Sequence, residues 1–405
     1  MHRILAINPG STSTKIAVYD DNTPRFKQTI SHSREELSRF PNLLDQYGWR
    51  KELIERALRH EGIDLHSISA VIGRGGIIQP VESGVYEVND ELRYDLEHAR
   101  VQHASNLGGL LARDIADEIG VKSFIADPVV VDEMIPYARI SGSPELPRES
   151  IFHALNQKAI ARRFARETNR KYEDLNLIVC HMGGGITVSA HRRGRVIDTT
   201  NALDGCGPFS PERSGSLPPG PLIRLCFSGK YTEEELMRIV HGAGGLMAHL
   251  GTTSVPEVIE RIESGDLHAM LILRAMVYTV AKEIGAMAIA FKGNVDAILI
   301  TGGMAHSKRI TDFMAQYVSF IAPIYVYPGE DELLTLAENA LAAVKGEREV
   351  KTYHSVAAED PSAINDRRRP SKLRDILLAA INPSASHMPT LSTIRQYLKK
   401  RFNTD

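Results

Sequence analysis

The sequence contains few cysteines, and their spacing is not typical of a metal or disulfide framework. Only three of the 405 residues are cysteine, at positions 180, 206 and 226, and no CxxC pair occurs. Such widely separated residues predict ordinary thiols in a reducing compartment. The absence of HExxH and of any Cys/His cluster in the sequence argues against a structural transition-metal site.

Long apolar runs and a large excess of one charge sign are also missing. The most apolar long stretch, residues 272–291, carries Arg274, Lys282 and Glu283, whereas a membrane span needs about 18 uncharged apolar residues. The formal net charge is only -2, so neither nucleic acid nor an anionic membrane is favoured as a partner. A strand-like run begins almost at once and leaves no room for a signal peptide, so we expect a cytoplasmic protein.

What the sequence does contain is a turn rich in glycine and hydroxyl residues that appears twice. The first copy is Asn8-Pro-Gly-Ser-Thr-Ser-Thr-Lys15, and the second is His181-Met-Gly-Gly-Gly185. Each lies between two apolar runs and predicts a β-hairpin whose tip has small side chains and bare amide groups. Such a tip can approach polyphosphate closely, because successive N–H groups form an anion nest. Two of them predict two related domains facing one nucleotide, and therefore a phosphotransferase.

The rest of the chain alternates strand and helix patterns, which indicates an α/β fold with covered sheets. We expect a first domain over residues 1–150, a second over 151–355 and an extension over 356–405. The expected strands are 4–7, 15–19, 70–72, 123–126, 177–180, 187–190, 195–198, 297–301 and 324–327. The expected helices are 34–39, 50–61, 104–119, 149–168, 268–292 and 332–344.

The extension differs from the rest in charge. It has nine Lys and Arg against five Asp and Glu, and two short amphipathic helices are predicted in it, near 372–381 and 391–402. A solvated or packed extension is favoured over a nucleic-acid or membrane role.

Several residues outside the hairpins are candidates for the site. Arg74 and Arg213 lie in glycine-punctuated loops, and an arginine fork matches phosphate oxygens bidentately. Asp127 follows a strand, where side chains often face the ligand crevice. His153 and His181 are open to either a structural or a ligand-binding interpretation. Thr301-Gly302-Gly303 ends a buried strand, which suits a nucleotide's sugar and α-phosphate, although tight packing explains such joints equally well.

The first hairpin is not a Walker loop. The GxxxxGK[ST] pattern is absent, and a strand rather than a helix follows the turn. Magnesium, brought by the nucleotide and held through water by carboxylates, is the expected ion.

Together these segments resemble the acetate kinase family of the actin, Hsp70 and sugar kinase superfamily, and within it the butyrate kinases. The similarity covers roughly residues 3–355. Besides the two hairpins, its most specific segments are Asp127–Glu133, Ser150–Lys158, Asn201–Gly205, Gly207–Arg213, Leu299–Gly303 and Tyr327–Glu332. The resemblance implies two duplicated actin-like (ribonuclease H-like) domains with a cleft for ATP and a short carboxylate between them.

The resemblance also implies roles for the candidate residues. Those it assigns to catalysis are Arg74, Asp127, His153 and Arg213, with the arginines bracketing the phosphoryl group and Asp127 organising the metal or substrate. Those it assigns to ATP or ADP are Asn8, Ser11, Ser13, Lys15, His181, Gly183, Gly184, Gly185, Gly302 and Gly303. Magnesium would be held by Asn8 and, through water, by Asp331 or Glu332.

The implied reaction is reversible, direct in-line phosphoryl transfer between ATP and butyrate or a branched acid of similar size. An acetate or propionate kinase is a near alternative. A different class is a non-catalytic, ATP-binding regulator or sensor on the same scaffold. That reading is motivated by the extension and by Thr253-Ser254, which stand where the family carries an Asn-Asp-like pair. The resemblance further implies a homo-oligomer, a dimer or higher.

Overall fold

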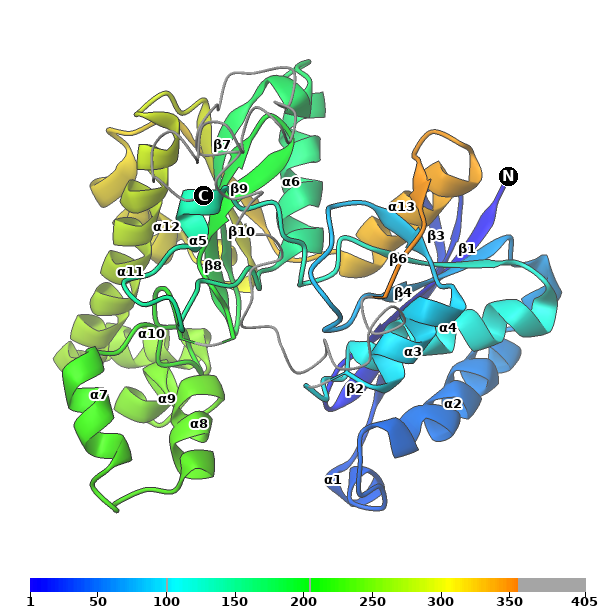
Figure 1. Cartoon of the computed structure of the whole chain (residues 1–405), viewed down its shortest axis with the longest axis horizontal. Coiled ribbons are helices and arrows are strands. Elements are labelled where there is room, and N and C mark those ends of the chain that lie inside the picture. The colour runs from blue at the N-terminus through cyan, green and yellow to red at the C-terminus, as the bar shows by residue number, and fades with distance from the viewer. Residues whose placement is uncertain (100, 204, 356–405) are drawn as a thin grey trace, which may run out of the picture.

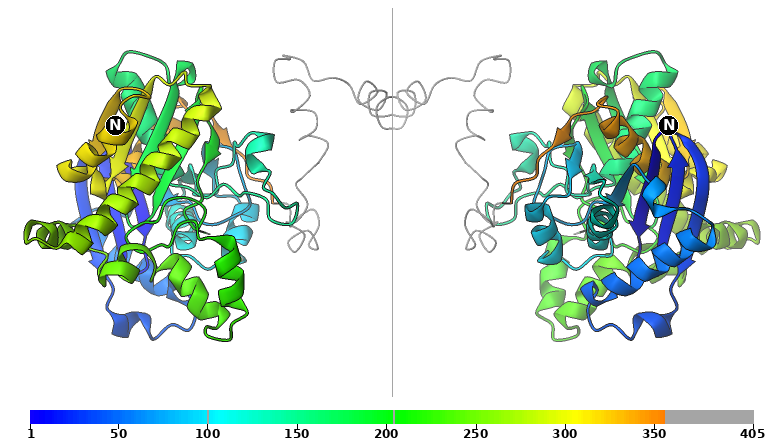
Figure 2. Two further views of the ribbon diagram at one scale, coloured as in Figure 1. Left: turned by 90° about the vertical axis from the view of Figure 1, so that its left-hand side faces the viewer. Right: turned by 90° about the vertical axis from the view of Figure 1, so that its right-hand side faces the viewer.

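The structure, a computed structural model, describes residues 1–355 except Arg100 and Asp204. The two helices predicted after residue 355 lie outside the described residues. Two β-sheets lie in separate halves of the molecule (Figure 1). Figure 2 shows them from the sides, with one half in front of the other. None of the described helices is long and apolar enough to cross a membrane.

The first sheet has seven strands, and the second has five. The first contains β1 (Arg3–Pro9), β2 (Ser13–Asp20), β3 (Thr23–Ser31), β4 (Ala70–Arg74), β5 (Val85–Glu87), β6 (Lys122–Ala126) and β12 (Val350–Lys351), in the order β12-β5-β6-β4-β1-β2-β3. The second contains β7 (Asn176–Met182), β8 (Ile186–Arg192), β9 (Arg195–Thr199), β10 (Ala297–Gly302) and β11 (Ile324–Pro328), in the order β11-β10-β7-β8-β9.

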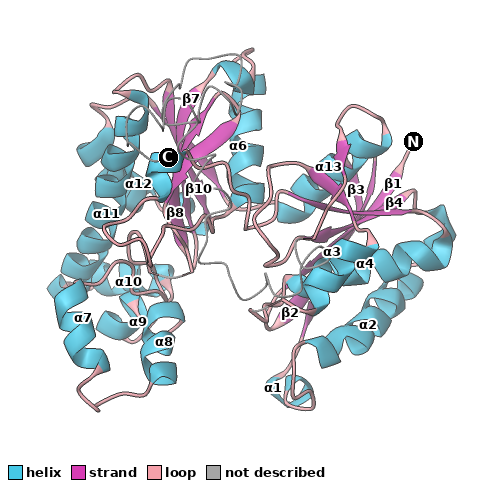
Figure 3. Cartoon of the chain, in the orientation of Figure 1, coloured by secondary structure: helices cyan, strands magenta, loops and turns pink. Residues whose placement is uncertain are grey.

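Helices cover the sheets (Figure 3). In the first half of the chain they are α1 (Arg34–Leu37), α2 (Tyr47–His60), α3 (Asp90–Glu97), α4 (Asn106–Ile119), α5 (Pro136–Arg139) and α6 (Ala154–Glu167). In the second half they are α7 (Pro219–Cys226), α8 (Glu233–His241), α9 (Gly245–Leu250), α10 (Val255–Glu263), α11 (Leu267–Ala288), α12 (Lys308–Val318) and α13 (Glu332–Val344).

Strand alternation divides each sheet between two helical layers. In β1, Leu5 and Ile7 pack in the cluster that includes α2 and α4, whereas Ile4 and Ala6 pack in the cluster that includes α13. In the second sheet, Ile178 and Cys180 of β7 face the α11 side, whereas Leu177 and Val179 face α6. Because successive strand residues point to opposite faces, the continuous apolar runs of β1 and β7 mean burial on both faces. The two halves therefore repeat one arrangement.

The end of the described chain returns to the first half. The sequence pattern placed residues 332–351 in the second domain, but α13 packs on the first sheet through Leu336, Ala337 and Ala340. Strand β12 then pairs with β5 in parallel. The segment 329–331, between β11 and α13, therefore passes from the second sheet to the first. Sequence spacing cannot reveal this crossing, since an amphipathic helix fits the apolar face of either sheet.

The helix predicted over 149–168 begins later, at Ala154. The residues before it are tied to the segment that joins the two halves, because Ser150 Oγ donates to the Val131 carbonyl and the Phe152 amide donates to the Val129 carbonyl. These bonds hold the backbone in a non-helical path. His153 thus becomes the N-cap residue of α6, which places its ring at the boundary between the halves.

Candidate active site

The first hairpin has the predicted form. β1 and β2 pair antiparallel with Asn8 opposite Lys15, and the Gly10 amide donates to the Ser13 carbonyl at 2.7 Å to close the turn. Ser11 lies exposed at the tip, and Lys15 is exposed on β2. The structure therefore brings Asn8, Ser11, Ser13 and Lys15 into one turn.

A buried arginine that the sequence analysis did not single out supports this hairpin from below. Arg50 of α2 has 0% of its surface exposed. Its guanidinium donates to the carbonyls of Gly10 (2.9 Å) and Ser13 (3.3 Å) and to Thr14 Oγ1 (3.0 Å). Outside the hairpin, the guanidinium donates to an uncharged acceptor, the Gln46 amide oxygen. Burial lowers the pKa of Arg50 to about 10. A buried cation thus lies directly beneath the turn predicted to bind phosphate.

The second hairpin needs glycine for space. Its turn is closed by a 3.0 Å bond from the Gly183 amide to the Gly185 carbonyl. A side chain at Gly185 would meet Arg213, with Cβ 2.9 Å from Cζ, and would contact the His153 ring. At Gly183, a Cβ would lie 3.0 Å from Glu330 and 3.0 Å from the His181 ring. The glycines therefore let charged and aromatic side chains close over the turn.

His153 and His181 stack on one another beside the second hairpin. Their ring centroids are 3.8 Å apart with an interplanar angle of 13°. Nδ1 of His153 lies 2.8 Å from Thr187 Oγ1, and Nδ1 of His181 lies 2.8 Å from Asn156 Oδ1. Burial lowers the pKa of His153 well below its usual value, helped by the neighbouring His181 and by positive charge nearby. His153 is therefore a neutral ring at physiological pH.

The segment 329–332 connects the two hairpins. Glu330 Oε1 lies 3.4 Å from His181 Nε2, and this contact is the main cause that lowers the pKa of Glu330. Two residues later, Glu332 accepts from Asn8 Nδ2 at 2.5 Å and from Arg74 at 2.7 Å. One short crossing segment thus holds an acid against each hairpin.

Of the two acids proposed for magnesium, the structure brings only Glu332 to the other candidates. Asp331 caps α13 by accepting from the Leu334 amide, and it pairs with Lys27 of β3 at 3.1 Å. It is largely exposed.

Residues from both halves line one pocket: Arg74, Gly75, Ala126, Asp127, Pro128, Val129, His153, Ala154, Leu155, Asn156 and Glu332. The pocket combines a cation, two acids and a neutral imidazole with apolar side chains such as Val129 and Leu155. Arg213 adds a second cation near His153. Burial lowers the pKa of Arg213, and its Nε is buried without a hydrogen-bond partner among the described residues. That Nε is a donor that an anion can satisfy.

Asp127 lies in the wall of this pocket with both oxygens engaged. Oδ1 accepts from Ser83 Oγ (2.6 Å) and from the Gly84 amide (3.0 Å), and Oδ2 pairs with Arg162 at 3.1 Å. Although burial opposes its ionisation, Arg162 and other cations outweigh burial and lower the pKa of Asp127. The residue is a fixed anion that organises the wall of the pocket.

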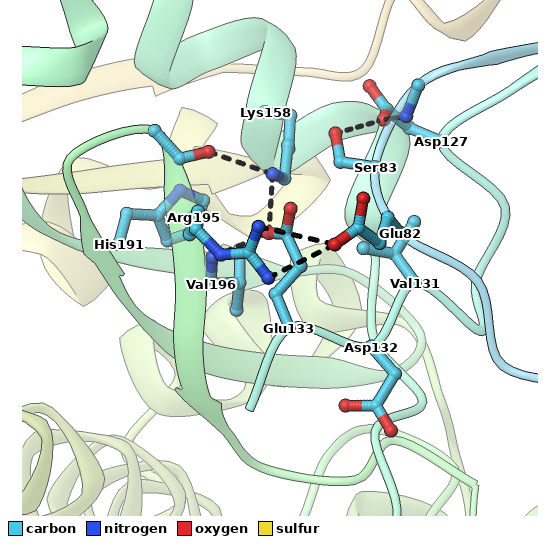
Figure 4. Close-up of polar contacts among 12 residues, drawn as sticks. Glu82, Ser83, Asp127, Val131, Asp132, Glu133, Lys158, His191, Arg195 and Val196 are labelled. Atoms are coloured by element: carbon cyan, nitrogen blue, oxygen red, sulfur yellow. Dashed lines mark hydrogen bonds and ion pairs between the residues drawn. The ribbon is translucent and has the colours of Figure 1, made fainter. Parts of the chain in front are cut away.

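A buried ion pair stabilises the segment that follows Asp127 in the chain. Lys158 of α6, 1% exposed, donates to Glu133 at 2.7 Å and to the Gly194 carbonyl at 3.0 Å (Figure 4). Glu133 also accepts from the Val196 amide at 2.7 Å. Burial lowers the pKa of Lys158, although Glu133 opposes that shift. The pair ties the chain between the halves to α6 and β9, so it is structural in role.

Of the two candidate adenosine glycines, only Gly302 has a clear backbone reason for being glycine. Gly302 has φ of 92°, and a Cβ there would lie 2.5 Å from the Met182 carbonyl oxygen, so close approach of β10 to β7 requires glycine. Gly303 faces open space. Ser254, in the loop that departs from the family pattern, caps α10 by accepting from the Glu257 amide at 3.3 Å.

Comparison with known proteins gives consistent matches. The model of the acetokinase family matches residues 146–322. Butyrate kinase 2 of Clostridium acetobutylicum is 53% identical over 353 residues, which is 87% of this chain and 99% of the relative. A probable butyrate kinase of Bacteroides thetaiotaomicron is 54% identical over 352 residues, again 87% of this chain and 99% of the relative.

Solved structures agree with the two-domain, actin-like fold. Acetate kinase from Porphyromonas gingivalis superposes with a TM-score of 0.68 at 17% identity, covering 84% of this chain and 99% of that one. A propionate kinase from Francisella tularensis gives a TM-score of 0.68 at 19% identity, with the same coverage. With half of its residues identical to butyrate kinases over nearly their whole length, the chain belongs to the acetokinase family.

Proposed function

We propose that the chain transfers a phosphoryl group reversibly between ATP and butyrate, or a branched acid of four or five carbons, to give the acyl phosphate and ADP. The observation that carries the proposal is the single pocket in which Arg74, His153 and Glu332 meet the apolar side chains of Val129 and Leu155. A short carboxylic acid has the same two parts, an anionic head and an alkyl chain. The butyrate kinases at more than half identity support this choice of substrate.

The cations answer the main electrostatic difficulty of the reaction, which brings an anionic acid to an anionic phosphate. We assign Arg74 and Arg213 to the two sides of the transferring group and His153 to a hydrogen bond with its oxygens. The turns of the two hairpins, with Lys15 on one and His181 on the other, hold the remaining phosphates. Phosphoryl transfer depends chiefly on such alignment and charge stabilisation.

Direct in-line transfer needs no strong general base, because the acceptor carboxylate is already ionised at neutral pH. A phosphoenzyme route would require a free carboxylate in the pocket. Asp127 has both oxygens engaged by Ser83, Gly84 and Arg162, and Glu332 is held by Arg74 and Asn8. Both acids thus serve to position groups, which favours the direct route.

Magnesium fits the side-chain oxygens of Asn8 and Glu332, two residues that lie side by side because Asn8 Nδ2 donates to Glu332 Oε2 at 2.5 Å. The described residues hold no cluster of three or more His, Cys, Asp or Glu suited to a metal. Magnesium usually keeps several waters and binds through one or two carboxylates and the substrate phosphates. When bound, the ion would neutralise charge on the phosphates. A homo-oligomeric state and a cytoplasmic location stay predictions.

The test is hydroxylamine trapping of acyl phosphate formed from ATP, Mg²⁺ and acids from acetate to valerate, including isobutyrate. We expect the highest kcat/KM with acids of four or five carbons, although one methylene changes specificity by only about 10–200-fold. Arg213→Ala serves as the control and should lose about 1,000-fold in rate with little change in melting temperature.

Other outcomes of the assay would change the proposed substrate, the role of Arg213 or the proposed activity. A maximum at acetate or propionate would replace the proposed substrate with the shorter acid. Equal turnover by the wild type and Arg213→Ala would remove Arg213 from the mechanism. ATP binding without acyl phosphate from any acid would favour the regulator or sensor alternative.

A further inference from the structure

A chain of buried polar side chains runs from the interior of the second half to the ring of His153. Its members are Tyr172, His191, Gln157 and Thr187, with exposed fractions of 6%, 0%, 0% and 0%. One of them, His191, lies near Lys158 (Figure 4). Burying a polar group costs free energy unless the group finds a hydrogen-bond partner. Four such groups in a row therefore suggest a role beyond packing.

The links of the chain are all short. Tyr172 Oη lies 2.7 Å from His191 Nδ1, and His191 Nε2 lies 3.0 Å from Gln157 Oε1. Gln157 Nε2 lies 2.8 Å from Thr187 Oγ1. Thr187 Oγ1 lies 2.8 Å from His153 Nδ1.

One backbone group fixes the orientation of the Gln157 amide. The Thr187 carbonyl, which can only accept, lies 3.2 Å from Gln157 Nε2, so the amide nitrogen of Gln157 faces Thr187 and its oxygen faces His191. His191 must then donate from Nε2. Its pKa is well below the usual value because of burial and the nearby cations Lys158 and Arg162, so this neutral ring accepts at Nδ1 from Tyr172.

The chain of hydrogen bonds continues from Gln157 through Thr187 to His153 in the active site. Thr187 Oγ1 accepts from the Gln157 amide, which leaves its single proton free to donate to His153 Nδ1, 2.8 Å away. Nδ1 of His153 is then an acceptor, and the proton of the neutral ring is on Nε2, at the opposite edge. We propose that Tyr172, His191, Gln157 and Thr187 act as positioning residues that hold His153 in the Nε2–H tautomer, as a neutral hydrogen-bond donor to the transferring phosphoryl group.

A neutral donor suits this location. His153 stacks on His181 and lies near two arginines, so a further positive charge on its ring would be repelled, whereas a directed N–H adds a hydrogen bond without that cost. A pre-set tautomer also avoids reorganisation as charge develops on the phosphoryl oxygens. The inference rests on the contact proposed above between His153 and the phosphoryl group, but its proton can be located without turnover.

The first measurement is the ¹⁵N spectrum of the full chain labelled at histidine, with the His153 signals assigned by their loss in His153→Asn. We expect a protonated Nε2 and an unprotonated Nδ1 in the wild type near pH 7. A proton on Nδ1, or a charged ring, would overturn the proposal whatever the kinase assay shows. Failure of the substrate proposal would instead appear as absent acyl phosphate with the Nε2–H tautomer intact.

The matched pair Thr187→Val and Thr187→Ser then tests the last link. Valine removes the hydroxyl at nearly constant volume, so His153 should populate both tautomers and kcat should fall about 10–100-fold, with KM changing much less. Serine keeps the hydroxyl and should restore both the spectrum and kcat. Equal spectra and equal kcat in the two variants would contradict the proposal.

Gln157→Glu provides a second route if Thr187→Val is unstable. It keeps an acceptor for His191 but loses the donor to Thr187, so the Thr187 proton is drawn away from His153 and the Nδ1–H tautomer should appear. Tyr172→Phe removes only the contact with His191 at the far end, so it should shift the tautomer of His153 the least of these variants. Retention of the Nε2–H tautomer in Gln157→Glu would argue against the chain as its cause.

Discussion

The two phosphate-type hairpins share a form but differ in what lies behind them. The first rests on the buried cation Arg50, which donates to the backbone carbonyls of the turn. The second is covered by Arg213 and stacked histidines, and the uncharged chain that ends at Thr187 lies behind it. The two turns are thus alike in form, but the side chains that contact them differ.

The difference separates two tasks of a phosphoryl-transfer site. A fixed positive charge below a turn stabilises a bound anion in the ground state and in the transition state alike. It therefore contributes to binding the nucleotide. Neutral, directed donors and the Arg213 guanidinium beside the other turn act at the place where charge develops in the transition state. We therefore expect damage to the first hairpin to appear mainly in affinity and damage to the second mainly in kcat.

The largest expected effect comes from the same substitution in both turns. In Gly185→Ala the new methyl would displace the Arg213 guanidinium, so kcat should fall on the order of 100-fold with little loss of stability, since only a side-chain end must move. In Gly10→Ala the nearest atom is the Ser13 carbonyl oxygen at 3.4 Å, an ordinary contact, and kcat should change less than about threefold. Acyl phosphate assays and melting curves on both variants check this. Equal losses would remove the distinction between the turns.

A smaller effect is expected from the support of the first hairpin. Arg50→Gln removes a buried cation and leaves carbonyls of the turn without donors, so the Kd for ADP should rise about tenfold and unfolding should become easier by about 2 kcal/mol. Calorimetric titration with ADP and denaturant unfolding measure the two quantities. Arg50→Lys restores charge without the fork, so recovery of affinity alone would assign the effect to charge. Arg93→Gln, which breaks surface pairs with Glu97 and Asp114, is the control and should leave affinity unchanged.

The smallest effect concerns pH. His32 contacts Thr14 of the first hairpin at 2.9 Å, and burial, together with Arg50, lowers its pKa to about 4. The unfolded chain takes up this proton below about pH 6.5 and the folded chain does not, so the stability from neutral His32 is full above that pH and falls as pH decreases toward 4. At pH 5.5 the loss should be about 1.4 kcal/mol. Urea unfolding of the wild type and His32→Gln from pH 8 to 5 measures it. Parallel curves for the two proteins would show that His32 is not responsible.

The sequence predicted both hairpins and most central strands, because burial on both faces leaves an apolar pattern that nothing else produces. The helix over 332–344 was confirmed to the residue. Short strands such as β5 and the edge strand β12 carry too few residues for a pattern. Helices α7 and α8 were not predicted, and neither has a buried residue, although Leu236, Ile239 and Val240 of α8 follow helical spacing.

The candidate site was likewise predicted only in part from the sequence. Residues in glycine-punctuated loops were recognisable, and the structure brings Arg74, His153 and Glu332 to one pocket. Arg50 and Gln157 were missed because they sit in ordinary helical patterns, where an arginine or glutamine normally faces solvent. Only their complete burial marks them. The choice between Asp331 and Glu332 also depended on helix orientation, which adjacent positions in a sequence do not distinguish.

The sequence by itself determined the local elements and the family, since turn chemistry, apolar periodicity and segment identity are properties of neighbouring residues. Tertiary structure alone decided that the 329–331 crossing brings Glu330 to one hairpin and Glu332 to the other. It also decided that four buried side chains point one proton toward His153. Both depend on distances between residues far apart in the chain, and hydrogen-bond direction is defined only once donor and acceptor are placed in space.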